Sequence, residues 1–414
     1  MKLEVVTIGT ELLLGQILDT NAAELGRALA AAGVEVVRHS SVADRPETIR
    51  AAVAEALDRT GFVITTGGLG PTRDDMTKRE VAELLGKPLE LDAAVLRSLE
   101  ERFRRLGRPM PAVNRTQAEV PAGATVLPNP RGTAPGLWVE DARGRVVVML
   151  PGVPSEMRGL LADEVLPRLA ARTSGTVVRS RTVRTTGIAE SALAERVGAI
   201  EEEIAPLTLA YLPSTDGVEL RVTAWSLRED EAERRLAAVV AQLRDRAGEH
   251  SYGEDGTDLA ATVLEALRRR RARLAVAESC TGGLLGARIT AVPGASDVFV
   301  GGVIAYDDDV KTAALSVPSE LIRAHGAVSE EVVLAMTLGA QQRFAVEAAL
   351  AITGIAGPTG GTAEKPVGTV WLAARFGNEA RALKRVFPGD RNEIRARSAQ
   401  AALDLLRRLL ADKP

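Results

Sequence analysis

Short apolar strands and amphipathic helices alternate along the first 170 residues. Runs such as 3–8 and 62–66 have the length and character of buried strands, and helical patterns separate them. Strands that alternate with helices form a mainly parallel sheet that is covered on both faces, so residues 1–170 are predicted as one α/β domain. The expected elements are strands at 3–8, 34–38 and 62–66, helices at 20–32, 47–57, 76–85, 92–106 and 154–169, and a hairpin at 136–150.

The pattern changes near residue 171 and again near residue 257. Residues 171–252 predict a small α+β domain without a dense glycine loop, and 253–256 predicts a linker. Residues 257–414 return to α/β alternation. The predicted fold is thus two α/β domains with mainly parallel sheets, joined by a small α+β domain. The further elements expected are strands at 177–184, 208–212, 218–226, 301–306, 348–353, 368–374 and 382–387, and helices at 191–203, 230–246, 259–267, 329–344 and 392–410. Residues 274–289 predict a strand, a tight glycine loop and a helix in succession.

The composition indicates a multidomain soluble protein. The chain has 414 residues, more than one core usually holds, with 46% hydrophobic and 26% charged residues and a net charge of −3. No apolar run reaches the roughly 18–20 residues of a membrane span, and the start MKLEVVTIG predicts a strand rather than a signal peptide. A single cysteine, Cys280, excludes an intramolecular disulfide and favours a cytoplasmic location. The mildly acidic balance disfavours nucleic acid as a partner.

Two scarce residue types limit the catalytic chemistry. The only histidines, His39, His250 and His325, lie outside every motif, which argues against a Ser-His-Asp triad and a histidine-bound zinc ion. Only seven of the 52 basic residues are lysines. Codon usage accounts for most of that ratio, yet a lysine inside a motif indicates a need for an amine that can lose its proton, which arginine cannot do.

Three loops in the third domain follow apolar strands and carry candidate catalytic groups. Ser279 and Thr281 precede Gly282-Gly283, where the backbone can approach a ligand closely. Tyr306 and Lys311 lie at and beyond the end of the next strand, and the sequence ITGIAGP follows a third. Because the carboxyl ends of strands share one crevice in open α/β sheets, the three loops are expected to converge on one ligand.

Ser279 is the predicted nucleophile and Lys311 the predicted base. Tyr306 could orient Lys311 or the substrate. Each residue has a structural alternative: Ser279 as a helix cap, Lys311 as a solvated side chain and Tyr306 as a core residue. Cys280 is expected in the core, because neighbours on an extended backbone point to opposite sides.

Four stretches make this constellation resemble a known family. AESCTGG, GGVIAYDDDVK, ITGIAGPTGG and KPVGTVW are similar to the C-terminal domain of the competence/damage-inducible protein A (CinA) family. That domain is similar to nicotinamide mononucleotide deamidases, which hydrolyse a carboxamide to the acid and ammonia without a cofactor. The resemblance implies catalysis by Ser279 and Lys311, with Lys365 as the second candidate base. It also implies a pocket lined by Glu278, Thr281, Gly282, Tyr306, Thr353, Gly354 and Gly357, with Arg391 at the 5′-phosphate.

A second candidate site lies in the first domain. The segment Thr65-Thr66-Gly67-Gly68-Leu69-Gly70 follows a strand and predicts a phosphate cradle made by backbone amides. Asp74 and Asp75 suit a hard divalent ion that bridges carboxylate and diphosphate oxygens, and Glu11 and Asp19 could add oxygens. Alternatively, Asp74 and Asp75 only cap the helix that follows them.

The first two domains also resemble parts of the CinA family. IGTELLLGQILDTNA, ITTGGLGPTRDD, NPRGTAPG and LPGVPSEM are similar to its MoaB/MogA-like domain, which is related to molybdopterin-binding proteins. In that family the domain is linked to ADP-ribose pyrophosphatase activity, which implies a divalent metal (Mg, Mn or Co) and the products AMP and ribose 5-phosphate. The middle domain resembles the family's KH-like domain but lacks the GxxG clamp for nucleic acid, so a spacer or dimerisation role is expected.

The leading hypothesis is a bifunctional hydrolase of pyridine-nucleotide recycling. It would act as a homodimer on nicotinamide mononucleotide and ADP-ribose, with no nucleic-acid or membrane partner. One alternative keeps the first domain as a pterin-binding or nucleotidyl-transferring relative. Another makes the protein a non-enzymatic adaptor in DNA uptake, against which the acidic balance and the missing clamp argue.

Overall fold

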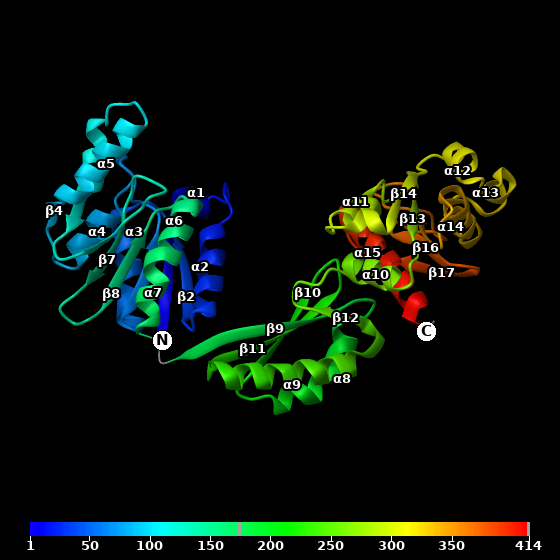
Figure 1. Ribbon diagram of the computed structural model, residues 1–414, viewed down its shortest axis with the longest axis horizontal. Helices are drawn as coiled ribbons and strands as arrows, with labels where there is room; N and C mark the ends of the chain where they lie inside the picture. The colour runs from blue at the N-terminus through cyan, green and yellow to red at the C-terminus, as the bar shows by residue number, and fades with distance from the viewer. Residues whose placement is uncertain (173–174, 412–414) are drawn as a thin grey trace. The chain divides into compact units, whose positions relative to one another are not determined.

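The structure, a computed structural model, describes residues 1–172 and 175–411. Residues 412–414, at the end of the predicted third domain, lie outside the described residues. The chain divides into two compact units, one formed by Met1–Arg179 with Ala224–Arg235 and the other by Ser180–Thr223 with Leu236–Pro414. Each unit is described separately (Figure 1).

The first unit is built on a six-stranded sheet with the order β2-β1-β3-β8-β7-β6. The first three pairings are parallel and the last two are antiparallel, so the predicted mainly parallel sheet is confirmed. Its strands are β1 (Lys2–Ile8), β2 (Glu35–Val42), β3 (Phe62–Thr66), β6 (Thr125–Leu127), β7 (Gly136–Glu140) and β8 (Val146–Leu150).

Helices cover both faces of this sheet, as the alternation of elements predicts (Figure 1). Leu25 of α2 and Met157 of α6 pack with one apolar cluster, whereas Ile49 of α3 and Val81 of α4 pack with another. Asp19 caps α2, because its Oδ1 accepts a hydrogen bond from Ala22 N at 2.9 Å. The helices are α1 (Thr10–Leu13), α2 (Thr20–Ala31), α3 (Pro46–Thr60), α4 (Thr77–Leu84), α5 (Ala93–Arg105), α6 (Pro154–Leu160) and α7 (Leu166–Ala170).

The closing helix predicted over 154–169 is interrupted. A π-helical turn, Leu161–Val165, separates α6 from α7. Pro167 has no N–H group to donate to the carbonyl of Asp163, so the regular i→i−4 ladder cannot continue there. Other elements were not predicted, because they are too short to show a period: α1, β6, a 3-10 helix (Ala112–Ala118) and a small sheet of β4 (Leu89–Leu91) and β5 (Glu119–Pro121).

The middle part of the chain forms a four-stranded sheet with the order β10-β11-β9-β12 and two helices, as expected for a small α+β domain. The predicted linker at 253–256 is partly wrong, because β12 pairs antiparallel with β9 and includes Gly253 and Glu254. The elements are β9 (Thr176–Thr185), α8 (Glu190–Glu203), β10 (Thr208–Pro213), β11 (Val218–Arg228), α9 (Glu229–Ala247) and β12 (Ser251–Glu254).

The last part of the chain is built on a five-stranded sheet with the order β14-β13-β15-β16-β17. The central strand β13 is parallel to β14 and β15, but β15, β16 and β17 form an antiparallel meander, so this sheet is mixed rather than mainly parallel. The connections after β15 and β16 contain no helix: residues 355–368 form a loop and residues 377–378 form a tight turn. The strands are β13 (Leu274–Glu278), β14 (Phe299–Ile304), β15 (Ala348–Gly354), β16 (Thr369–Phe376) and β17 (Glu379–Val386).

Two apolar layers cover this sheet. Leu264 of α10 and Leu406 of α15 belong to the larger cluster, and Met336 of α14 belongs to the other. Two of the helices, α12 and α13, were not predicted. The helices are α10 (Leu259–Arg269), α11 (Leu284–Thr290), α12 (Asp308–Leu315), α13 (Ser319–His325), α14 (Glu330–Phe344) and α15 (Arg391–Ala411).

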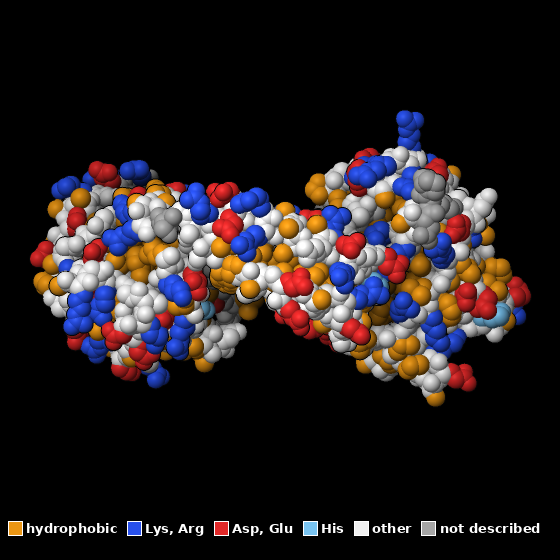
Figure 2. Space-filling model, turned by 90° about the horizontal axis from the view of Figure 1, so that it is seen from below, with side chains coloured by type: hydrophobic (Ala, Val, Ile, Leu, Met, Phe, Trp, Pro, Cys, Tyr) orange, Lys and Arg blue, Asp and Glu red, His pale blue; other side chains and the backbone are white. Residues whose placement is uncertain are grey.

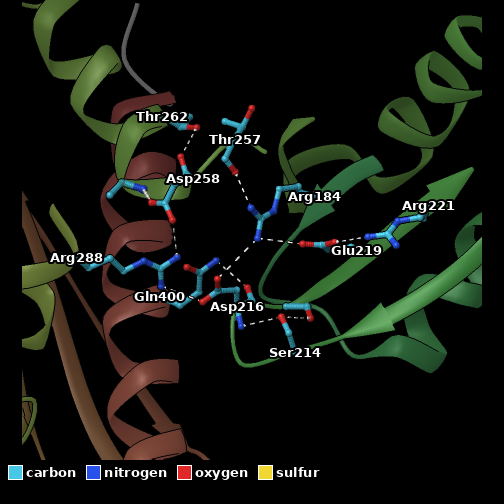
Figure 3. Close-up of polar contacts among 12 residues, drawn as sticks. Arg184, Ser214, Asp216, Glu219, Arg221, Thr257, Asp258, Thr262, Arg288 and Gln400 are labelled. Atoms are coloured by element: carbon cyan, nitrogen blue, oxygen red, sulfur yellow. Dashed lines mark hydrogen bonds and ion pairs between the residues drawn. The ribbon is translucent and has the colours of Figure 1, made fainter. Parts of the chain in front are cut away.

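Within the second unit, one polar network joins the β10–β11 turn to the helices of the last domain (Figure 3). The Asp216 carboxylate forms ion pairs with Arg288 Nη1 at 3.0 Å and with Arg184 Nη2 at 3.8 Å. The backbone carbonyl of Asp216 accepts a hydrogen bond from Gln400 Nε2 at 2.7 Å. Arg288 also pairs with Asp258, the N-cap of α10, at 3.3 Å. A single turn of the middle domain is thereby held by α10, α11 and α15.

Candidate functional site

The ends of three neighbouring strands meet at one edge of the last sheet. In the parallel register Glu278 of β13 lies beside Ile304 of β14 and Ile352 of β15. The loops that begin at Ser279, Ala305 and Ile355 therefore leave from the same edge. This common edge agrees with the sequence analysis, and convergence of the three loops on one ligand stays a prediction.

The first loop is organised by the buried side chain of Glu278, which is 1% exposed. Its carboxylate accepts hydrogen bonds from the backbone amides of Gly283 at 3.0 Å, Leu285 at 3.0 Å and Gly286 at 2.8 Å. These amides open α11 and would otherwise be unpaired. The resemblance placed Glu278 in the substrate pocket. In the structure its carboxylate oxygens accept hydrogen bonds from the backbone and position the loop.

Ser279 and Thr281 lie in this loop with their side chains buried. Ser279 N donates to Ile352 O at 2.9 Å, which ties the start of the loop to β15. The alternative that Ser279 caps the next helix is wrong, because Gly283 is the N-cap of α11. Thr281 Oγ1 is buried and has no hydrogen-bond partner within residues 1–172 and 175–411.

Arg395 holds the same loop from α15. Its guanidinium donates to Thr281 O from Nη2 at 2.7 Å and from Nε at 3.2 Å. Sequence analysis did not single out Arg395. The available signal was its i, i+4 spacing from Arg391, which places the two arginines on one face of a helix.

Lys311 lies on α12 and is 1% exposed, so the alternative of a solvated side chain is wrong. Its Nζ donates to Asp308 Oδ1 at 2.9 Å and to Tyr306 O at 3.4 Å. In the part of the chain that the structure describes, no hydrogen bond joins Lys311 Nζ to Ser279 Oγ. The two groups lie on segments that leave the same sheet edge. Asp308 was not predicted, although it stands in the conspicuous run Asp307-Asp308-Asp309.

Tyr306 links the second loop to the third through Arg391, and not through Lys311. Its side chain is 60% exposed, so the core alternative is wrong. Its hydroxyl accepts a hydrogen bond from Arg391 Nη2 at 2.9 Å, and Arg391 Nη1 donates to Gly357 O at 2.6 Å. Arg391, the first residue of α15, thus connects the loop after β14 with the loop after β15, at a helix N-terminus that favours anions.

The remaining predicted pocket residues of this domain have structural roles. Thr353 Oγ1 donates to Ala327 O at 2.8 Å, and a Cβ at Gly354 would lie 2.7 Å from Val370 Cγ2. The second candidate base, Lys365, donates from Nζ to Val328 O at 2.8 Å and to His325 O at 3.1 Å. Gly282 has a φ of 59°, a conformation that favours glycine, and its Cα faces open space apart from Arg395.

Cys280 belongs to the large apolar cluster of the last domain, which confirms the prediction that it fills the core. Burial raises the pKa of its thiol to about 12. The thiolate, which is the nucleophilic form, is therefore scarce at neutral pH, and Cys280 does not compete with Ser279 as a nucleophile.

The glycine loop of the first domain is built for close backbone approach. Gly67 has a φ of 109°, and a Cβ there would overlap Ile8 O. Beside it, Thr66 Oγ1 donates to Pro151 O at 2.9 Å and accepts from Asn21 Nδ2 at 3.1 Å. Asn21 also donates to Gly152 O at 2.8 Å, and its Oδ1 is buried without a partner among the described residues. Asn21 is a site residue that sequence analysis missed.

The four carboxylates predicted to bind a metal do not form a cluster of three or more ligands among the described residues. No group of three or more Asp, Glu, His or Cys side chains in the described ranges could hold a metal ion. Asp19 caps α2 and pairs with His39 at 3.3 Å, and Asp75 accepts from Thr72 N at 2.9 Å. The prediction that Asp74 and Asp75 bind a divalent ion, with oxygens added by Glu11 and Asp19, therefore stays a prediction. The alternative that Asp74 and Asp75 only cap the next helix is wrong, because the N-cap of α4 is Met76 and no side chain caps it.

The face of the molecule that Figure 2 shows carries charges of both signs. In Figure 2, side chains of Lys and Arg are interspersed with those of Asp and Glu over the visible face. Within the described residues, no helix combines the length and the apolar character that crossing a membrane requires.

Three family models match consecutive parts of the chain. They are the "Probable molybdopterin binding domain" over residues 4–171, the "Damage-inducible protein CinA KH domain" over 180–253 and the "CinA C-terminal domain" over 256–410. Fold and sites together define a three-domain protein that combines a molybdopterin-binding-type α/β domain, a KH-type domain and a CinA-type α/β domain.

Relatives share this whole arrangement. A CinA-like protein of Gemmatimonas aurantiaca is 56% identical over 414 residues, which cover 99% of this chain and 97% of the relative. A putative competence-damage inducible protein of Symbiobacterium thermophilum is 46% identical over 98% of both chains. The chain belongs to the CinA family. Among solved structures, a CinA superfamily protein from Klebsiella pneumoniae is 36% identical, with a TM-score of 0.37 over 37% of this chain and 97% of its own.

Proposed function

We propose that the last domain is an amidohydrolase that converts nicotinamide mononucleotide to nicotinate mononucleotide and ammonia. The single observation that carries the proposal is the position of Lys311. A fully buried lysine, on a helix that starts from the same sheet edge as the Ser279 loop, supplies an amine where an amide substrate would meet a serine hydroxyl. The resemblance of this edge to the deamidase motifs supports the choice of substrate.

In the proposed reaction, Ser279 Oγ attacks the carboxamide carbon while Lys311 Nζ, released from Asp308, takes the hydroxyl proton. The backbone amides of Cys280 and Thr281 would stabilise the oxyanion. Lys311 then gives its proton to the departing nitrogen, and ammonia leaves as the C–N bond breaks. Water hydrolyses the resulting acyl ester, which returns Ser279 and releases the carboxylate.

Arg391 is the proposed partner of the substrate 5′-phosphate. It lies at the first turn of α15 and already contacts Tyr306 and Gly357 at the mouth of the loops. A guanidinium with fork geometry at a helix N-terminus suits a phosphate. Loss of this contact should raise KM more than it lowers kcat, because phosphate binding is far from the reacting carbon.

The test is ammonia release from nicotinamide mononucleotide by the full chain. Ser279→Ala and Lys311→Met should each lower kcat by at least about 100-fold, because each removes a group that reacts in the rate-determining chemistry. Cys280→Ala is the matched control, since it changes a buried neighbour of Ser279 and should keep the rate. Full activity of the Lys311 variant would assign the base role to another group.

A second proposal concerns the first domain, where the buried hydroxyl of Thr65 can donate a hydrogen bond to a diphosphate and the buried carbonyl oxygen of Asn21 can accept one from a ribose hydroxyl. Thr65 Oγ1 and Asn21 Oδ1 have no hydrogen-bond partner among the residues described, and both lie beside the glycine loop. We infer that this cradle binds ADP-ribose and that its hydrolysis gives AMP and ribose 5-phosphate. Since the carboxylates do not form a metal site by themselves, no catalytic step is assigned to a metal ion here.

Two assays test the second proposal. The full chain is incubated with ADP-ribose in the presence and absence of Mg²⁺, Mn²⁺ or Co²⁺, and AMP release is measured. Asn21→Leu should lower AMP release by at least about tenfold while ammonia release by the last domain stays unchanged. Binding of a molybdopterin precursor without AMP release would favour the pterin-binding alternative instead.

A further inference from the structure

A cavity of about 720 Å³ lies inside the second unit, apart from the loops that carry Ser279 and Lys311. Its walls come from the loop 186–189 before α8, the β10–β11 turn, the end of β17 and α15. Its volume is in the range of small-molecule sites. None of the residues proposed for amide hydrolysis lines it.

The charges of this cavity are unbalanced. Its three carboxylates are already paired with arginines: Asp216 with Arg288 at 3.0 Å, Asp404 with Arg408 at 2.8 Å and Glu249 with Arg408 at 2.7 Å. Two further arginines of the wall, Arg385 and Arg397, have no carboxylate partner in the described ranges. The cavity therefore presents two guanidinium groups that a dianion would neutralise.

Gln400 adds an independent observation. It lines the cavity, is 2% exposed, and donates from Nε2 to the carbonyl of Asp216 at 2.7 Å. A carbonyl can only accept, so this bond fixes the orientation of the amide and identifies Oε1 as the acceptor on its other side. Oε1 is buried and has no partner within the described residues, and the same holds for Arg397 Nε. Buried polar atoms usually have a hydrogen-bond partner, so this acceptor and this donor are available to a ligand in the cavity.

We propose that this cavity binds a phosphate monoester. Arg385 and Arg397 hold the phosphate dianion, since guanidinium groups bind phosphate through paired N–H bonds. The organic part of the ligand donates an O–H or N–H bond to Gln400 Oε1. α8, which starts next to the cavity wall at Glu190 and has no side-chain cap, adds the positive end of a 14-residue helix.

The test is isothermal titration of the full chain with three probes: inorganic phosphate, ribose 5-phosphate and AMP. The variants are Arg385→Ala, Arg397→Gln and Gln400→Met, and the matched control is Arg323→Ala, an exposed arginine on α13 outside the cavity. Arg385 is itself exposed, so its variant is expected to fold. Any phosphate bound by the glycine loop of the first domain contributes equally to all of these proteins.

At least one monoester should bind the unchanged chain, and Arg385→Ala and Arg397→Gln should each weaken its binding about tenfold or more. Gln400→Met should weaken the binding of the monoester but leave the binding of inorganic phosphate unchanged, because only the organic part of the ligand reaches Oε1. Equal affinities in the unchanged chain and in both arginine variants would overturn the proposal. If inorganic phosphate binds as tightly as both monoesters, the assignment of the ligand as a monoester is overturned.

Discussion

Replacing Glu278 with glutamine tests whether one buried carboxylate holds the candidate active-site loop. Glu278→Gln keeps the shape of the side chain but offers a single oxygen. In the native loop, Oε2 accepts from Gly283 and Leu285, and Oε1 accepts from Gly286. The new amide nitrogen should replace Oε1, which has one partner, rather than Oε2, which has two.

The expected loss of folding free energy follows from these three hydrogen bonds. The Gly286 amide would face an NH₂ group and lose its acceptor, which costs about 1.5–3 kcal/mol for a hydrogen bond to a charged group. The two bonds that remain would lose their charge assistance, which roughly doubles the strength of such bonds. We therefore expect a total destabilisation of about 2–4 kcal/mol and faster opening of the loop 279–286.

Hydrogen exchange of peptides that cover the loop, together with urea unfolding of the full chain, measures both effects. Glu265→Gln is the matched control, because Glu265 is a half-exposed acid on α10 whose ion pair with Arg269 contributes little. Ammonia release should fall with Glu278→Gln and stay unchanged with Glu265→Gln. Native exchange rates and native stability in Glu278→Gln would refute the view that this carboxylate positions Ser279.

Three further predictions concern single groups. Burial raises the pKa of the Cys280 thiol to about 12, so Cys280 should resist iodoacetamide at pH 8 in the folded chain and react after unfolding. Mass spectrometry would detect the label, and rapid labelling of the native chain would contradict the burial of Cys280. Burial lowers the pKa of Lys78 to about 8 from 10.5, so the unfolded chain binds more protons between these values and stability should rise from pH 8 to pH 10.5. In Lys78→Met, urea unfolding should lose that rise; an unchanged pH profile would exclude Lys78 as its source. Gly67→Ala should destabilise the first domain by at least ~2 kcal/mol in thermal unfolding, because alanine disfavours a φ of 109° and its Cβ would overlap Ile8 O. The control is Gly86→Ala, which should destabilise the domain less because open space surrounds Gly86.

The sequence was sufficient for features that repeat or that follow strands. The periods of 2 and 3.6 predicted most long elements, and the apolar strand before Ser279 predicted the edge from which the three loops leave. A short helix gives no such period. α12, with eight residues, was missed for that reason, although the lysine it carries was singled out by its rarity.

The errors concern the local partners of side chains. The sequence Asp19-Thr20-Asn21 predicts a helix cap, and Asp19 does cap α2. Neither spacing nor composition shows that Asp75 accepts a hydrogen bond from Thr72 or that Glu278 accepts hydrogen bonds from three amides, and these bonds decide which carboxylates are free for a ligand. The antiparallel turn from β15 to β16 likewise depends on the loop between them, whose glycines and prolines indicate a turn but not its direction.

α15 is a 21-residue rod, about 30 Å long at 1.5 Å per residue, and both of its ends are fastened. Its first residue contacts the Tyr306 hydroxyl, and near its last turn Arg407 reaches the backbone of Glu249 in the middle domain. Because a rigid rod turns as a whole, a tilt of roughly 2° about one end moves the other by about 1 Å. A tilt imposed on α15 at Arg407 by the middle domain is thus expected to displace Arg391, the proposed phosphate partner, although the middle domain does not contact that arginine in any bond described above.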